Sequence, residues 1–494
     1  MKKQLFLKCL MSILIILIGR SVFPQDSNTN IWPQFRGINC SGVAHPDQNP
    51  PVDLESAEKL IWKSPVISGA SSPCIWGDKI FLTGFDKEKQ QLQVMCYNRL
   101  NGKQIWNRIV PTNEIEPYHV SGSPADATPV TDGERIYVHF GSYGLLCYDF
   151  SGEIVWTKEL PANTDKFGSG TSPILVDNLL ILMVRRLASK ERYLLALDKT
   201  QGKQIWKQNL IEAGYSTPVV WGDDIVVHCE GFVAGYSIED GSRSWLILVR
   251  THGESTPIVH EDILYVNAWH YLGYLNYPKE VTGVDEFLVK YDSNQDELIS
   301  RQEFPEAFFP SNKTENIAVS SNSNDKSKEV WSWFETDNND FMDKPELQRY
   351  LNFCIAIDQG IVAFKSGGKG DISSSHILWR EIENVAEVPS PLYFKERIYI
   401  IKNGGFFSCV DARTGTLIYK TRLKGTGPYF ASPVVANDLI YTAAHNGRVV
   451  VLAAGDELKV ISVNNFKEKI LATPAIVDNT IYMRTDKHLY AFAD

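Results

Sequence analysis

The sequence predicts an all-β fold, an eight-bladed β-propeller, from three observations. A Ser-Pro or Thr-Pro pair opens a short apolar run eight times, most copies close on a Trp, and the last copy lacks a strand that the N-terminal region can supply. The prolines are Pro73, Pro129, Pro173, Pro218, Pro257, Pro391, Pro433 and Pro474. Successive prolines lie 39 to 56 residues apart except for one gap of 134, whereas a four-stranded blade takes about 40–45 residues. The regular spacing predicts the blades, and the long gap predicts an insertion.

The third copy shows the strands of one blade in order. Residues 171–176 give the first strand, 179–184 the second, 193–198 the third and 204–206 the fourth. Proline suits the start of a strand because it fixes φ and donates no hydrogen bond to the sheet. The Asp-Asn pair between the first two strands tolerates the positive φ that tight hairpins need.

A large aromatic residue ends the fourth strand of most copies. These residues are Trp106, Trp156, Trp206, Trp245 and Trp379, with Tyr419 as a substitute. In five copies a glycine that suits a left-handed turn comes shortly before this position, namely Gly102, Gly152, Gly202, Gly241 and Gly415. We expect the aromatic rings to be buried between neighbouring blades, where they stabilise the fold through the apolar area they remove from water.

The eighth copy ends with the chain after its third strand. Residues 59–63, Lys-Leu-Ile-Trp-Lys, match the fourth strand of the other copies and precede the first Ser-Pro pair. We expect this segment to complete the last blade and close the ring, which removes open sheet edges.

The N-terminal segment and the net charge indicate where the protein acts and which partners it has. Residues 1–25 carry Lys2, Lys3 and Lys8 before an apolar core, the layout of a secretory signal peptide, and residues 26–58 form an N-terminal extension. The protein is therefore expected to be exported to the periplasm or the extracellular space, where it could associate with the envelope. No later stretch approaches the length of a membrane span. A net charge of −10 disfavours nucleic acid as a partner. The protein is expected to be a monomer.

Seven cysteines follow Cys9, without C-x-x-C spacing or the density of a small disulfide scaffold. Three of them, Cys96, Cys147 and Cys409, occupy matching places in their repeats. We expect buried free thiols rather than disulfides.

The repeat resembles a known family at its turns. The segment from Asp198 to Trp206, and in part Asp411–Gly415, is similar to the tryptophan-docking repeat of quinoprotein dehydrogenases and their non-enzymatic relatives. The opening Ile31–Gly37 and the blade from Trp379 to Asp411 resemble secreted PQQ-binding-like propeller proteins of bacteria. The resemblance covers nearly the whole mature chain and implies a propeller of quinoprotein type.

The same resemblance implies which residues a quinone-dependent enzyme of this family would contain. Family members that are dehydrogenases have an adjacent Cys-Cys pair, a Trp that supports the quinone and a calcium site of Glu, Asn and Asp. No Cys-Cys pair occurs in this sequence, and the calcium set cannot be placed on it. PQQ is therefore not expected as a cofactor.

The insertion falls in the fifth blade, at residues 276–354, between propeller segments 59–275 and 355–494. Its first acidic loop matches the EF-hand calcium motif, in which alternate oxygen donors converge on one ion. The predicted ligands are Asp292, Asn294, Asp296, the backbone carbonyl of Leu298, Ser300 and Glu303. Glu297 takes the sixth position, where the motif prefers Gly, which should lower the affinity.

A second loop of the same pattern follows 43 residues later. Its predicted ligands are Glu335, Asp337, Asn339, the backbone carbonyl of Phe341, Asp343 and Glu346. Glu335 replaces the usual Asp and Asp340 the usual Gly, so weaker binding is expected. Short helices flank both loops, and two such loops predict a paired EF-hand that binds calcium. The alternative is that both are solvated acidic loops.

Connections between blades approach the central channel of a propeller and can form a ligand funnel. The residues expected there are His119, Ser169, Tyr215, His252, Glu254 and Tyr429. A protein, a peptide or a carbohydrate could bind at this face, and ordinary loop residues are the alternative.

The sequence favours an exported, non-catalytic binding or scaffolding propeller that binds calcium through its insertion. No catalytic residues are assigned. A PQQ-dependent dehydrogenase and an interaction propeller of the outer-membrane assembly type are the two alternatives.

Overall fold

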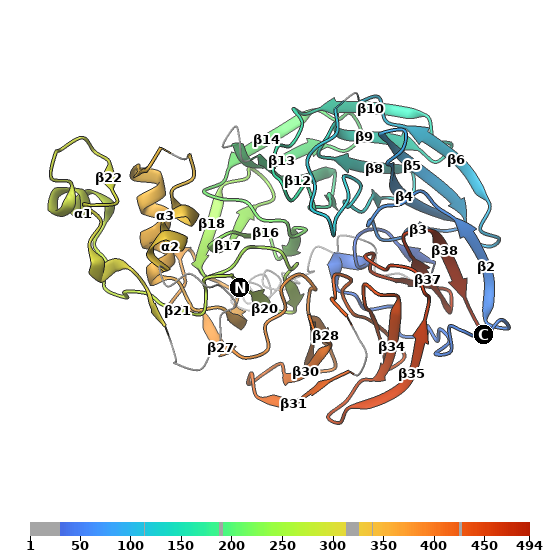
Figure 1. Ribbon diagram of the computed structural model, residues 1–494. Helices are drawn as coiled ribbons and strands as arrows, with labels where there is room; N and C mark the ends of the chain where they lie inside the picture. The colour runs from blue at the N-terminus through green and yellow to red at the C-terminus, as the bar shows by residue number, and fades with distance from the viewer. Residues whose placement is uncertain (1–29, 113, 187–190, 313–325, 338, 424–426) are drawn as a thin grey trace, which may run out of the picture.

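The computed structural model describes residues 30–494 apart from 113, 187–190, 313–325, 338 and 424–426. Eight antiparallel sheets surround a central axis (Figure 1), so the predicted eight-bladed propeller is confirmed. The predicted signal peptide, residues 1–25, lies outside the described residues. The described part contains no helix that is long and apolar enough to cross a membrane.

The first four blades follow one another in sequence. Blade 1 contains β1 (Ile31–Trp32), β3 (Cys74–Trp76), β4 (Lys79–Asp86), β5 (Gln91–Asn98) and β6 (Gln104–Ile109). Blade 2 contains β7 (Val130–Thr131), β8 (Arg135–Phe140), β9 (Gly144–Asp149) and β10 (Ile154–Glu159). Blade 3 contains β11 (Ile174–Val176), β12 (Leu179–Arg186), β13 (Glu191–Asp198) and β14 (Gln204–Asn209). Blade 4 contains β15 (Val219–Trp221), β16 (Asp224–Cys229), β17 (Phe232–Ser237), β18 (Arg243–Leu248) and, as a fifth strand, β26 (Gly370–Asp371).

The last four blades complete the circle. Blade 5 contains β19 (Ile258–His260), β20 (Ile263–Ala268), β25 (Gly360–Lys365) and β27 (Ile377–Glu381). Blade 6 contains β28 (Leu392–Phe394), β29 (Arg397–Lys402), β30 (Phe406–Asp411) and β31 (Leu417–Arg422). Blade 7 contains β32 (Val434–Ala436), β33 (Leu439–Ala443), β34 (Arg448–Ala453) and β35 (Lys459–Asn465). Blade 8 contains β36 (Ala475–Val477), β37 (Thr480–Arg484), β38 (His488–Phe492) and β2 (Leu60–Pro65).

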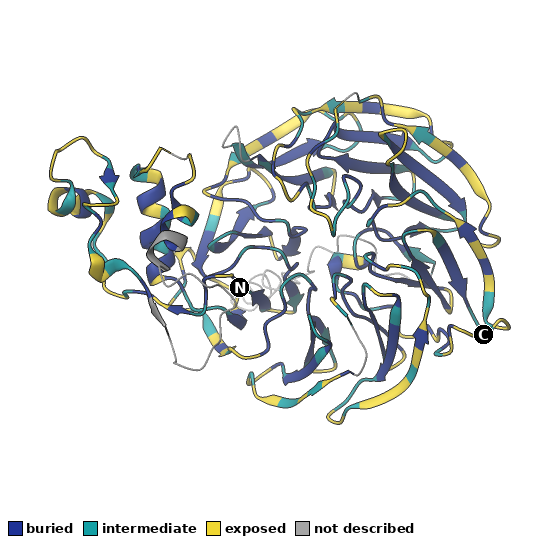
Figure 2. Ribbon diagram, in the orientation of Figure 1, coloured by how far each residue is buried: buried dark blue, intermediate teal, exposed yellow. Residues whose placement is uncertain are grey.

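The strand β2 joins the two ends of the propeller. It pairs antiparallel with β38, with Trp62 opposite Ala491 and Ser64 opposite Leu489. The N-terminal region therefore supplies the outermost strand of the blade that the C-terminus otherwise forms. The inner strands are buried, and the outer strands other than β18 each expose several residues (Figure 2).

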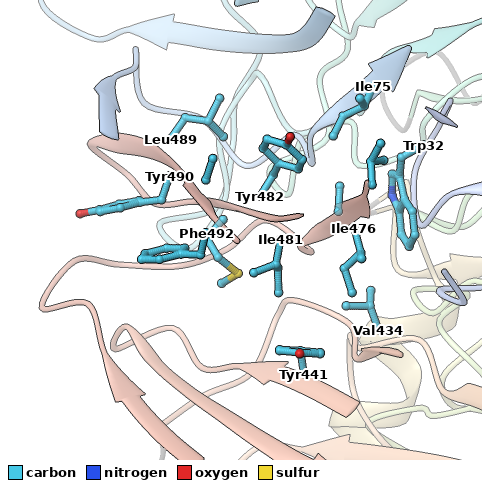
Figure 3. Close-up of a cluster of buried hydrophobic side chains, with 14 of the residues drawn as sticks. Trp32, Ile75, Val434, Tyr441, Ile476, Ile481, Tyr482, Leu489, Tyr490 and Phe492 are labelled. Atoms are coloured by element: carbon cyan, nitrogen blue, oxygen red, sulfur yellow. The ribbon is translucent and has the colours of Figure 1, made fainter. Parts of the chain in front are cut away.

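Blades pack on one another through continuous apolar clusters. One cluster connects blades 7, 8 and 1, and Figure 3 shows part of it. Its labelled members are Trp32, Ile75, Val434, Tyr441, Ile476, Ile481, Tyr482, Leu489, Tyr490 and Phe492. The seven cysteines of the described residues are buried and unpaired, as expected for structural thiols.

The residues that precede the eight prolines form a closed ring of hydrogen bonds. In each, the backbone N–H donates to the side-chain hydroxyl of its counterpart in the next blade, over 2.9–3.4 Å. In order around the axis they are Ser72, Thr128, Ser172, Thr217, Thr256, Ser390, Ser432 and Thr473, whose N–H returns to Ser72. All eight are buried. The following proline keeps this residue extended and adds no N–H of its own.

The predicted tryptophans dock on the next blade. The indole N–H of each donates to a backbone carbonyl there over 2.9–3.1 Å, as Trp62 to Arg99, Trp106 to Phe150, Trp156 to Lys199, Trp206 to Ile238 and Trp379 to Ala412. The ring lies on the glycine of the adjacent turn. At Gly202, with φ +69°, a Cβ atom would come within 2.6 Å of Trp156.

Trp245 is the exception, because blade 5 has no such turn. Trp245 is buried, but its N–H donates to Asp224 of its own blade over 2.8 Å. The loop between β25 and β27 instead reaches blade 4, where β26 pairs parallel with β18. Main-chain pairing replaces tryptophan docking at this junction.

The insertion connects β20 to β25 and lies beside blade 4 at the edge of the ring (Figure 1). Its elements are β21 (Leu275–Asn276), α1 (Val284–Tyr291), β22 (Ile299–Ser300), a 3-10 turn (Glu306–Phe308), β23 (Ser311–Asn312), α2 (Lys326–Phe334), β24 (Phe341–Met342) and α3 (Lys344–Ile355). It has an apolar core of its own, which includes Phe287, Phe304, Trp331, Phe334 and Tyr350.

We predict that Thr473→Val destabilises the propeller. The variant keeps the shape of the side chain but leaves the buried N–H of Ser432 without its acceptor, at a cost of about 1–3 kcal/mol. Thr157→Val, on an exposed position of β10, is the matched control. Chemical denaturation measures both, and equal stabilities would show that the ring hydroxyl is dispensable.

Candidate functional site

A cavity of about 1000 Å³ opens over the central channel. The eight hydroxyl residues of the ring line it, and so do the residues two positions before each of them. These second residues are Ala70, Asp126, Gly170, Tyr215, Glu254, Val388, Phe430 and Leu471. In an extended chain alternate side chains point to the same side. The ring therefore places two tiers of side chains around one channel.

The second tier has an apolar and a polar part. Blades 6, 7, 8 and 1 contribute Val388, Phe430, Leu471 and Ala70, which form a continuous apolar arc. Blades 2 to 5 contribute Asp126, Gly170, Tyr215 and Glu254. The channel is therefore amphipathic across its width.

Four of the six expected funnel residues line this cavity: His119, Tyr215, His252 and Glu254. Ser169 and Tyr429 do not. Ser169 donates to Glu116 over 2.9 Å in a separate small pocket, and Tyr429 is buried in an apolar cluster between blades 6 and 7. Both lie three positions before a ring residue, an offset at which Glu387 lines the cavity but these two side chains do not. Their neighbours Gly170 and Phe430 take the lining positions instead.

The insertion forms one wall of the cavity. Ser332, Trp333, Glu335, Thr336 and Arg349 line it together with propeller residues. The Trp333 indole N–H donates to Glu230 over 3.3 Å, and its ring lies 5.0 Å from that of His252. The sequence predicts the calcium loops and the funnel as separate sites. Nothing in the spacing of residues along the sequence indicates that the two sites are in contact.

Ion pairs join the insertion to the propeller at this wall. Arg349 of α3 lies 3.2 Å from Glu212, which also pairs with Arg192 at 2.7 Å. A third arginine of the cavity, Arg185, pairs with Asp165 at 3.2 Å and with Glu230 at 3.4 Å. Each arginine that lines the cavity is thus neutralised by a carboxylate.

Arg250 fixes the end of α3. Its side chain is fully buried, and it donates to the carbonyls of Phe353 over 3.0 Å and Cys354 over 2.8 Å. It also pairs with Asp358 at 2.5 Å. Because the last carbonyls of a helix have no partner within it, this arginine holds the insertion against blade 4.

Two carboxyl groups of the cavity each keep one buried oxygen without a hydrogen-bond partner among the described residues. They are Asp126, through Oδ1, and Glu254, through Oε2. Burial raises the pKa of Asp126 to about 7. Burial and the charge of Glu387 raise the pKa of Glu254 to about 8. Near neutral pH both groups are therefore poised between the acid and the carboxylate.

Glu230, His252 and His270 approach one another within 4.8 Å, the spacing of a metal site. Their hydrogen bonds do not fit one. Nε2 of His252 accepts the N–H of Tyr271 over 3.1 Å, and Nδ1 of His270 accepts the N–H of Leu272 over 3.0 Å. Each ring then carries its proton on its other nitrogen, so neither ring has an unprotonated nitrogen left for a metal. A histidine that binds a metal does so through its unprotonated nitrogen and donates a hydrogen bond from the other.

The two predicted calcium loops lie side by side. β22 of the first pairs antiparallel with β24 of the second, with Ile299 opposite Met342. Glu297 and Asp340, at the sixth positions, adopt φ +65° and +68°. Both loops thus make the turn that usually requires glycine, at a cost in backbone strain.

The carboxylates are arranged differently in the two loops. In the second, Glu335, Asp337 and Glu346 bring oxygens within 4.8 Å of one another. In the first, hydrogen bonds from the Ser300 N–H and from the hydroxyls of Ser293 and Ser300 lower the pKa of Glu303 to about 2. Asp292 accepts the N–H groups of Gln295 and Glu297. The donor types of both loops are those of a hard cation site.

We predict that Glu254→Gln stabilises the protein at high pH. Because the folded-state pKa of Glu254 lies above its usual 4.5, stability is lost as pH rises from that value through about 8. The glutamine removes this loss, so the melting temperature should rise by a few degrees at pH 8 and stay unchanged at pH 4. Glu88→Gln, on an exposed hairpin, should change neither. A pH-independent difference for Glu254→Gln would contradict the assignment.

Solved structures that share this fold include two dehydrogenases and a BamB protein. BamB from Moraxella catarrhalis is 11% identical with a TM-score of 0.52, covering 88% of this chain and 97% of that one. A europium-containing methanol dehydrogenase is 11% identical with a TM-score of 0.58, covering 95% and 99%. Quinohemoprotein alcohol dehydrogenase from Comamonas testosteroni is 9% identical with a TM-score of 0.56, covering 94% and 81%. Identities of this size show the fold alone.

Among curated proteins, none matches this sequence. A family model does, over residues 93–185, 151–270 and 358–493, and its description is outer membrane protein assembly factor BamB. These segments leave out the insertion and together exceed half of the chain. The repeats that build the ring thus show that the chain belongs to this BamB family.

Proposed function

We propose that the protein is an exported binding module without a catalytic centre of its own, and that its insertion binds calcium and forms a wall of the ligand cavity. One observation carries the proposal: Glu335 and Thr336 of the second calcium loop line the same cavity as the propeller channel. The membership of the BamB family supports a propeller that binds rather than one that catalyses.

The ligands proposed for calcium are those of the two loops. In the first they are Asp292, Asn294, Asp296, Ser300 and Glu303, with the carbonyl of Leu298. In the second they are Glu335, Asp337, Asn339, Asp343 and Glu346, with the carbonyl of Phe341. Calcium takes six to eight oxygens at short range. It would offset the repulsion among these carboxylates and hold the insertion in one shape.

The charges of the cavity argue against PQQ as a ligand. The cofactor is a polycarboxylate and needs unpaired cations, but Arg185, Arg192 and Arg349 already pair with Asp165, Glu212 and Glu230. The carboxyl groups left over, Asp126 and Glu254, would repel it. The quinone-dependent dehydrogenase is therefore not the function that the geometry favours.

We predict that calcium raises the melting temperature and the protease resistance of the insertion. A ligand at 100 times its Kd adds about 2.7 kcal/mol to stability. Asp292→Asn with Glu303→Gln should remove the response of the first loop, and Glu346→Gln that of the second. Glu306→Gln, exposed and outside both loops, should respond like the parent. If all variants respond alike to calcium, the calcium assignment fails.

An interaction propeller for outer-membrane assembly is the second candidate, favoured by the family match. A photo-crosslinking residue in place of Phe167, exposed at the cavity rim, should then capture an assembly protein in cells. The same residue at Val155, exposed on the outer strand β10, should not. Capture at both positions or at neither would argue against this candidate.

A further inference from the structure

The unpaired charge of the cavity is negative. Its arginines are neutralised by Asp165, Glu212 and Glu230, and Lys166 lies exposed at the rim. Glu254 and Asp126 each keep a buried oxygen without a partner among the described residues. A buried carboxyl group is costly unless a cation or a hydrogen bond compensates it. The cavity is therefore built to receive positive charge.

A second carboxylate stands beside Glu254. Glu387 lines the same cavity, and its charge acts on Glu254. One oxygen of Glu387 accepts a hydrogen bond from the side-chain amide of Asn403, which fixes its position. The two carboxyl groups come from the connections that lead into blades 5 and 6, next to each other in the ring.

The apolar arc begins where this pair ends. Val388 follows Glu387 directly, and Phe430 and Leu471 continue the arc through blades 7 and 8. A metal cation needs oxygens on all sides, and this arc offers none. An organic cation can use both surfaces, because its charged end pairs with the carboxylates while its body packs on apolar side chains.

We propose that the cavity binds a primary amine with an apolar body, with the ammonium group at Glu254 and Glu387 and the body against Val388, Phe430 and Leu471. This rests on the proposed binding function and names its ligand class. The ammonium group stabilises the carboxylate of Glu254, so binding near neutral pH releases a proton from it. The ring hydroxyls below remain as donors and acceptors for polar substituents of the ligand.

Isothermal titration of the mature protein with 2-phenylethylamine tests this. We expect one binding site, a Kd at least about tenfold weaker for Glu254→Gln, and an unchanged Kd for the surface control Glu88→Gln. The uncharged isostere 2-phenylethanol should bind at least about tenfold more weakly. Phe430→Ala, which keeps both carboxylates, should also weaken binding.

Three results would overturn the proposal: no heat of binding at millimolar amine, equal binding of the alcohol, or an unchanged Kd in both Glu254→Gln and Phe430→Ala. Circular dichroism of each variant separates a lost site from a lost fold. The calcium titrations are independent of this experiment. Failure of the amine with an intact calcium response would remove the ligand class and leave the binding function.

Discussion

The hydrogen-bond ring of serine and threonine hydroxyls holds the centre of this propeller together. Each blade offers one N–H and one hydroxyl, and each N–H finds the hydroxyl of the next blade, from Ser72 around to Thr473 and back. An unmade bond in this buried position would cost more than a made bond contributes. The ring therefore favours one angular relation between all blades over any sliding of a single sheet.

The tryptophan contacts act at the opposite, outer end of the sheets. Where a glycine turn is present, the indole N–H donates to a carbonyl of the turn and the ring packs on its glycine. Trp156 does this with Lys199 and Gly202. Where blade 5 lacks that turn, β26 pairs with β18 instead. The inner ring is uniform, whereas the outer contacts adapt to local sequence. This division lets one blade carry a large insertion without loss of closure.

Much of the fold could be predicted from the sequence, because prolines and tryptophans recur at positions that only a repeated sheet explains. At Ser169 and Tyr429 the prediction of the funnel is one residue out of register, because closeness to the proline does not determine which side of the chain faces the channel. Trp245 differs from its counterparts because blade 5 lacks the glycine turn that would receive its indole, which no pattern around Trp245 reveals. The wall made by Trp333 and Arg349 depends on how the insertion packs against blades 4 and 5, a long-range contact without a sequence signal.

The pairing of β2 with β38 has a consequence for biosynthesis. β2 ends at Pro65 and β38 begins at His488, so the closing strand is made early and waits for a partner that follows 423 residues later. Until β38 has been synthesised, β2 lacks its pairing partner and the ring stays open. Contacts of such sequence separation form slowly. The ring can therefore close only once β38 has been made, and the blades formed earlier keep an open flank until then.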